Sequence, residues 1–231
     1  MTGIVARTRG LPGSRLGVRL AWAVLWLLLG IASLEFLLAA YGKYRHLDSA
    51  AYGMFMTRRG WLWMHLAGGL TTVLLGPVQF FTQWRQRHPR LHRVTGRIYL
   101  SGMLVAATGA VGLIASSPAP FAIRLAFSAT ALAWLTTALT GLVAIRRGAV
   151  EKHRRWMVRN YAVTLAPILF RLSLPLAIAS GLAPSPTLIA TLLWCSWTVP
   201  LLACEAVRRL AGLWGPARAR PAEAMPFPGA R

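Results

Sequence analysis

Six long apolar segments, each able to cross a lipid bilayer as a helix, constrain this chain more than any other feature of its sequence. A helix rises about 1.5 Å per residue and the bilayer core is about 30 Å thick, so a span needs about 20 mostly apolar residues. The composition, 56% hydrophobic and only 13% charged, is unlike that of a water-soluble domain. We expect spans at about residues 20–41, 61–84, 98–115, 125–145, 156–182 and 186–204.

These spans predict an all-α fold, a polytopic membrane helical bundle that forms one transmembrane domain over residues 18–211. The sequence lacks the alternating strand pattern of an outer-membrane barrel. The flanking segments, residues 1–17 and 212–231, are rich in Gly, Pro, Ala and Arg, and we expect disordered tails there. A cleaved signal peptide is the competing interpretation of the first span, but its 22 apolar residues exceed the usual length of a signal core.

The net charge of +21 is distributed over alternate loops, as in a membrane protein, and not over one face of a soluble domain, as in a nucleic-acid-binding protein. Twenty Lys and Arg residues lie before the first span, between the second and third, around the start of the fifth, and after the sixth, against five in the other three loops. This asymmetry predicts a multi-pass protein of the cytoplasmic (inner) membrane with both termini inside. Attraction to anionic lipid headgroups on the cytoplasmic side follows from the same charge, and no nucleic-acid partner is expected.

Three ionisable residues are predicted to lie in the outer half of the membrane, where a charge costs on the order of 2.5 to 3.5 kcal/mol. They are Glu35 in the first span, His65 in the second and Arg171 in the fifth, within about 10 Å of one another in depth. Glu35 and Arg171 are candidates for a structural ion pair. Alternatively, Arg171 binds an anionic ligand and His65 relays protons.

A second polar set is predicted at the cytoplasmic boundary of the spans. Boundary arginines often extend to lipid phosphates and boundary histidines often cap helices, so a purely structural interpretation stays open. The alternative is a ligand site in which His92 and His153 approach each other and could ligate a haem. The set consists of Gln79, Gln83, His92, Arg97, Tyr99, His153, Arg159, Asn160 and Glu205.

Small residues and prolines predict where helices approach and where they bend. In the second span, His65, Gly68, Gly69, Thr72, Gly76 and Gln79 recur at three- and four-residue steps, so this stripe should face protein rather than lipid. In the fifth span, steps of seven, four and seven residues place His153, Asn160, Thr164 and Arg171 on one face. In the same span, Pro167 and Pro175 each remove one intrahelical hydrogen bond.

Several motifs, taken in order, resemble a bacterial family of predicted membrane proteins, domain of unknown function family 2306. The resemblance covers roughly residues 60–182. It implies a polytopic membrane protein and no established activity. The motifs are His65-x-x-Gly68-Gly69, Gly76-Pro77-x-Gln79-Phe80, Leu91-His92-Arg93-x-x-Gly96-Arg97-x-Tyr99, Trp134-x-x-Thr137, His153-x-x-Trp156-Met157-x-Arg159-x-Tyr161 and Arg171-Leu172.

Three functions are compatible with these residues. The first is membrane redox chemistry with haem b or a quinone, in which His92 and His153 are the haem ligands. The second is a transporter or a membrane protein that binds a small anionic ligand, and the third is a non-catalytic scaffold or assembly subunit. No hydrolase, phosphate-loop or zinc motif is present, and the sequence leaves the substrate and the oligomeric state open.

Overall fold

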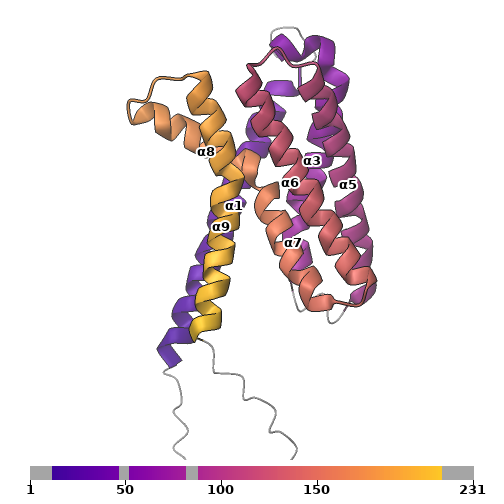
Figure 1. Cartoon of the computed structure of the whole chain (residues 1–231), viewed down its shortest axis with the longest axis vertical. Helices are drawn as coiled ribbons and strands as arrows, with labels where there is room; N and C mark the ends of the chain where they lie inside the picture. Colours follow the sequence, from indigo (N-terminus) through magenta and orange to yellow (C-terminus); the bar gives the residue numbers. More distant parts are fainter. Residues whose placement is uncertain (1–11, 47–51, 82–87, 215–231) are drawn as a thin grey trace, which may run out of the picture.

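A computed structural model of the protein describes residues 12–46, 52–81 and 88–214, and within these residues it has helices and no strands. Its elements are shown in Figure 1. They are α1 (Pro12–Tyr44), the 3-10 helix η1 (Gly53–Arg58), α3 (Arg59–Phe80), α5 (Pro89–Ala115), α6 (Phe121–Arg146), α7 (Val150–Thr164), α8 (Ala166–Ala179) and α9 (Pro186–Trp214).

The prediction of six membrane-spanning helices is confirmed for the described residues. Six helical stretches are long and apolar enough to cross a membrane, and the fifth of them, Val150–Ala179, comprises both α7 and α8. Helices α1 and α9 extend beyond the predicted domain boundaries, to Pro12 and Trp214. The remainder of the two predicted tails lies outside the described residues.

The fifth span is two helices rather than one. α7 ends at Thr164, and α8 begins at Ala166 with Pro167 in its first turn. Pro167 has no N–H to donate to the carbonyl of Val163, and its ring crowds the preceding turn, so the chain breaks at Leu165. Figure 1 shows the result, since α7 lies beside α6 whereas α8 turns away toward the start of α9.

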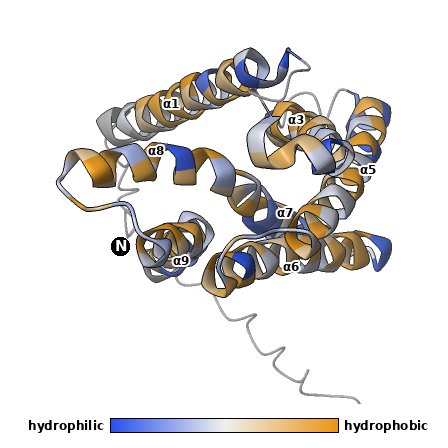
Figure 2. Ribbon diagram, turned by 90° about the horizontal axis from the view of Figure 1, so that it is seen from above, coloured by the Kyte–Doolittle hydropathy of each residue, from blue (hydrophilic) through white to orange (hydrophobic). Residues whose placement is uncertain are grey.

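Helices α3, α5, α6 and α7 form one group, and α9 packs against α6, α7 and α8. Seen from above in Figure 2, α8 lies between α1 and α9. Helix α1 joins the group through an aromatic cluster in which Trp26 lies 6.0 Å from Phe80 and 6.3 Å from Tyr161, measured between ring centroids. From Ala23 to Gly42, the side chains of α1 are exposed or only partly buried, as expected of a helix that faces lipid.

Helices α3 and α5 approach so closely that two glycines at their contact, Gly68 and Gly109, have no room for a side chain. A Cβ atom on Gly68 would lie 2.3 Å from the carbonyl oxygen of Gly102, and one on Gly109 would lie 2.5 Å from the backbone nitrogen of His65. A Cβ atom on the adjacent Gly69, by contrast, would meet nothing within 4 Å. The predicted small-residue stripe therefore does face protein at Gly68 but not at Gly69.

The two ends of the bundle differ in charge. One end, here called the basic end, contains the starts of α5 and α7 and the ends of α6 and α9 (Figure 1).

At the opposite end, the buried Arg58 donates hydrogen bonds to the carbonyl oxygens of Met54 and Leu113. Leu113 lies in the last turn of α5, where carbonyls lack helical partners, so Arg58 secures that helix end.

Candidate functional site

A buried polar cluster joins α5, α6 and α7. The hydroxyl of Tyr99 donates to Oδ1 of Asn160 at 2.7 Å and contacts Oγ1 of Thr164 at 2.9 Å. The amide nitrogen of Asn160 donates to the carbonyl of Trp134 at 2.9 Å and to Oγ1 of Thr137 at 3.0 Å, and Trp134 Nε1 donates to Thr164. Tyr99 is 2% exposed and Asn160 is fully buried. The structure thus brings together two predicted site residues, Tyr99 and Asn160.

The hydrogen bonds of this cluster satisfy its central residue. Oδ1 of Asn160 accepts one bond and Nδ2 donates two, which uses both ends of the amide. A buried polar network of this kind fixes the register of its helices, because any slip would leave a polar group unpaired in an apolar surrounding. We therefore interpret Tyr99 and Asn160 as packing residues. Sequence reasoning placed Asn160 and Thr164 on one face but did not include Thr137, Trp134 or Thr164 in the site.

Two of the predicted histidines donate to backbone carbonyls of a neighbouring helix. Nδ1 of His65 lies 3.0 Å from the carbonyl oxygen of Ala106, and Nδ1 of His153 lies 2.8 Å from that of Gly141. A carbonyl only accepts, so in both rings Nδ1 carries the proton. His65 thereby links α3 to α5 and His153 links α7 to α6, and in the neutral form of either ring Nε2 has a lone pair.

The third histidine, His92, meets a different partner. The amide of Gln79, at the end of α3, accepts from Oγ1 of Thr95 at 2.6 Å and donates to Nδ1 of His92 at 3.0 Å. An Nδ1 that accepts is unprotonated, so a neutral His92 carries its proton at Nε2. His92 thus contacts α3 whereas His153 contacts α6. That the two rings also face one another across a shared ligand stays a prediction.

Arg171 and Glu35 are both exposed, and no ion pair joins them among the described residues. The Arg171 guanidinium lies instead over the ring of Phe36, 5.1 Å from its centroid. The contact connects α8 to α1 at Phe36, the residue that follows Glu35 in the sequence. The Phe36 ring lies against one face of the guanidinium, and no hydrogen bond or ion pair of Arg171 is present among the described residues.

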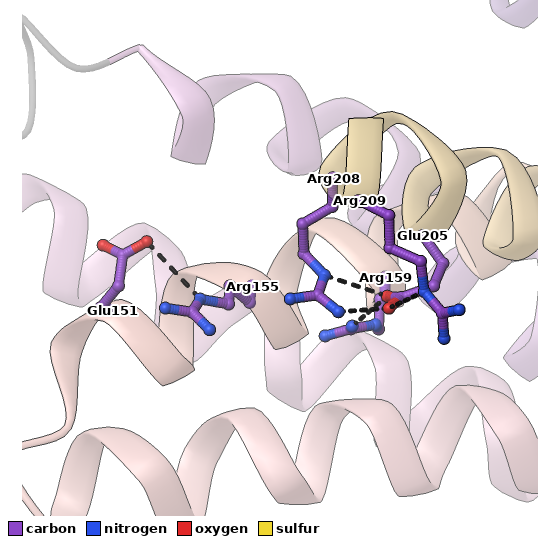
Figure 3. A network of polar contacts seen from close by, with 6 residues as sticks. All are labelled: Glu151, Arg155, Arg159, Glu205, Arg208 and Arg209. Carbon is purple, nitrogen blue, oxygen red and sulfur yellow. Dashed lines mark hydrogen bonds and ion pairs between the residues drawn. The ribbon is translucent and has the colours of Figure 1, made fainter. Parts of the chain in front are cut away.

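The largest group of charges lies at the basic end, where α7 meets α9. The carboxylate of Glu205 on α9 accepts from Arg159 of α7 at 2.8 Å, and it also binds Arg208 and Arg209 of its own helix (Figure 3). Arg159 and Glu205 are only 24% and 26% exposed at their side chains, so this ion pair is partly shielded from solvent. The Arg159 guanidinium also lies over the Trp156 ring, 4.9 Å from its centroid.

An open cleft of about 640 Å³ lies beside this network. Four cationic side chains and one carboxylate line it, together with an apolar wall. The lining carboxylate, Glu151, lies 3.7 Å from Arg155 (Figure 3), and it lies 3.2 Å from Arg154. The lining residues are Ala149, Val150, Glu151, Lys152, Arg155, Trp156, Arg159 and Arg208.

Of the predicted site residues, Arg159 alone lines this cleft, and Arg97 is an exposed residue of α5. Sequence reasoning assigned Lys152, Arg155 and Arg208 to topology only. A signal was present, because Lys152, Arg155, Trp156 and Arg159 follow one another at steps of three, one and three, which places them on one face of a helix. Their convergence with Arg208 from α9 required the fold.

Comparisons with known proteins identify the family of this chain but assign it no activity. A family model described as a predicted membrane protein (DUF2306) matches residues 62–207, from α3 to the end of α9 that carries Glu205. No curated protein and no solved structure matches the chain.

Proposed function

We propose that this chain, which belongs to the DUF2306 family of predicted membrane proteins, binds an anionic ligand in the cleft between α7 and α9. One observation carries the proposal. Four cations from two helices (Lys152, Arg155, Arg159 and Arg208) line a single cleft, and the carboxylates bound to them number only two, Glu151 and Glu205. Arg154 and Arg209 share the same two carboxylates, so six cations face two carboxylates, which leaves an excess of four positive charges in this group of described residues.

The arrangement differs from that of arginines that merely extend to lipid. An isolated boundary arginine is free to follow the nearest phosphate. Here Arg159 is held between the carboxylate of Glu205 and the face of Trp156, so its donors stand in a fixed place before any ligand arrives. Ordered donors lose less conformational entropy on binding, and guanidinium groups suit the oxygens of carboxylates and phosphates.

The side of the membrane on which the cleft opens follows from the charge distribution. Basic residues are concentrated at the end of the bundle that bears the cleft, and the positive-inside rule assigns such an end to the cytoplasm. The proposal therefore includes a cytoplasmic opening of the cleft, in a protein of the cytoplasmic membrane with both termini inside.

Thermal unfolding of the purified protein in a neutral detergent tests this function. A ligand at 100 times its Kd stabilises the folded state by about 2.7 kcal/mol, so inorganic pyrophosphate should raise the melting temperature at constant ionic strength. Lys152→Gln should reduce this rise, because it removes one of the cations that line the cleft. Lys152 is exposed, so the substitution leaves the packing of the helices intact. The matched control is Arg93→Gln, an exposed basic residue of α5 outside the cleft. Equal rises in both variants would contradict the proposal.

Membrane redox chemistry is the second candidate, on one observation. Nδ1 of His153 donates to a backbone carbonyl, which is the arrangement that orients a metal-ligating imidazole and leaves Nε2 for the metal. Its predicted partner, His92, accepts at Nδ1 from Gln79, and this tautomer protonates the Nε2 that a haem iron would need. An absorption spectrum of the protein purified without added haem separates the two functions, because a Soret band lost in His153→Ala supports the redox function.

A further inference from the structure

The cleft also indicates which kind of anion it would bind. We infer that the ligand is a phosphomonoester dianion carried by a membrane lipid, an inference that rests on the proposed anion-binding function. It follows from the charge of the cleft, from the contacts that leave particular donors accessible, and from the level of the cleft along the spans.

The charge of the cleft matches two negative charges better than one. Six cations, the four that line the cleft together with Arg154 and Arg209, are opposed by the two carboxylates of Glu151 and Glu205, which leaves an excess of +4. A phosphomonoester carries about −1.5 to −2 at neutral pH, whereas a phosphodiester carries about −1. The excess therefore accommodates both charges of a dianion, which gains more electrostatic stabilisation there than a single charge does.

Two of the four cations are the accessible donors. The guanidinium groups of Arg159 and Arg208 are held by Glu205, as Figure 3 shows. Arg155 forms only a long ion pair with Glu151, at 3.7 Å, and Lys152 takes part in no ion pair among the described residues. Both side chains are exposed, so a phosphate can bind them without breaking the stronger pairs around Glu205.

The level and the walls of the cleft favour a lipid over a free solute. The cleft lies where two apolar spans end, Val150–Ala179 and Pro186–Leu210, which is the level of lipid headgroups. A volume of about 640 Å³ exceeds what one phosphate group occupies and falls within the range of ligand pockets, about 300 to 1,000 Å³. Ala149, Val150 and the ring of Trp156 supply an apolar wall for the ester substituent.

Titration with short-chain lipids in neutral detergent tests the inference. The probes are dioctanoyl phosphatidic acid, dioctanoyl phosphatidylglycerol and inorganic phosphate, and binding is read by native mass spectrometry and by thermal shift. We expect phosphatidic acid to bind about tenfold more tightly than phosphatidylglycerol, which corresponds to about 1.4 kcal/mol. It should also bind more tightly than inorganic phosphate, and Lys152→Gln, unlike Arg93→Gln, should weaken it.

Each alternative outcome overturns a defined part of the reasoning. If inorganic phosphate binds as tightly as phosphatidic acid, the lipid is wrong and the proposed anion site stands. If both lipids bind equally, the preference for a dianion is wrong. If Lys152→Gln and Arg93→Gln bind every probe alike, the cleft is not the site and both the inference and the proposed function fail. Melting temperatures without ligand, equal to that of the unchanged protein, show that the variants are folded.

Discussion

Removal of one hydroxyl from the buried polar cluster should cost this protein a measurable part of its stability. Tyr99→Phe keeps the ring that packs against its neighbours and deletes only the oxygen, which contacts Oδ1 of Asn160 at 2.7 Å and Oγ1 of Thr164 at 2.9 Å. Thr164 retains the donor from Trp134 at 2.8 Å. Asn160, which is fully buried, is left with an unpaired acceptor.

The expected magnitude follows from that unpaired oxygen. A buried group that loses its hydrogen-bond partner costs about 1–3 kcal/mol. Single hydrogen bonds between membrane helices average about 0.6 kcal/mol and reach about 1.7 kcal/mol, because the unfolded chain also finds partners in the micelle or bilayer. We therefore expect Tyr99→Phe to lower the free energy of unfolding by about 1–2 kcal/mol, and Asn160→Leu by at least as much.

The assay is unfolding of the detergent-purified protein by increasing mole fractions of sodium dodecyl sulfate. Tyr161→Phe is the matched control, since Tyr161 is also buried but its hydroxyl makes no hydrogen bond within the described residues. In a double-mutant cycle, Tyr99→Phe and Asn160→Leu should be less than additive, as expected for residues in contact. Equal losses for Tyr99→Phe and Tyr161→Phe, or strict additivity in the cycle, would refute the packing role of the cluster.

Three further results are expected. Gly68→Ala should destabilise the protein by about 1–3 kcal/mol in the same assay, because its Cβ would meet the backbone of α5, whereas Gly69→Ala should be neutral or stabilising. Arg171→Leu and Glu35→Gln should have additive effects on stability, since no ion pair joins the two side chains among the described residues. A double variant more stable than the Arg171→Leu variant would instead support the predicted ion pair. Reporter fusions should confirm the predicted topology by giving a cytoplasmic signal after Gly148 and a periplasmic signal after Ala119 and Ala183.

The membrane fold was predictable because a bilayer imposes one length on every helix that crosses it. A run of about 20 apolar residues therefore identified each span. The break at Leu165 was only partly predictable, since Pro167 indicated a lost hydrogen bond but not the direction in which the chain would turn. That direction depends on the contacts of α8 with α1 and α9, which link residues far apart in the sequence.

The candidate site was less predictable than the fold. Helical periodicity placed Asn160 and Thr164 on one face of α7, and the structure adds the hydroxyl of Tyr99 from α5. Periodicity could equally have grouped Lys152, Arg155 and Arg159, but it could not show that α9 brings Glu205 and Arg208 to the same place. Pairing between helices is set by tertiary packing, which the periodicity of a single sequence does not reveal.

Photo-crosslinking within living membranes tests most directly that the cleft between α7 and α9 binds an anionic ligand. A benzoylphenylalanine is introduced in place of Val150, which lines the cleft and is 55% exposed, or in place of Val94 of α5, which is 50% exposed at the same end of the bundle. After irradiation, mass spectrometry of the purified protein should find a phosphorus-containing adduct at position 150 and none at position 94. Adducts of the same kind and yield at both positions, or no adduct of an anionic molecule at position 150, would contradict the account. An anionic adduct without phosphorus would overturn only the inference of a phosphate ligand.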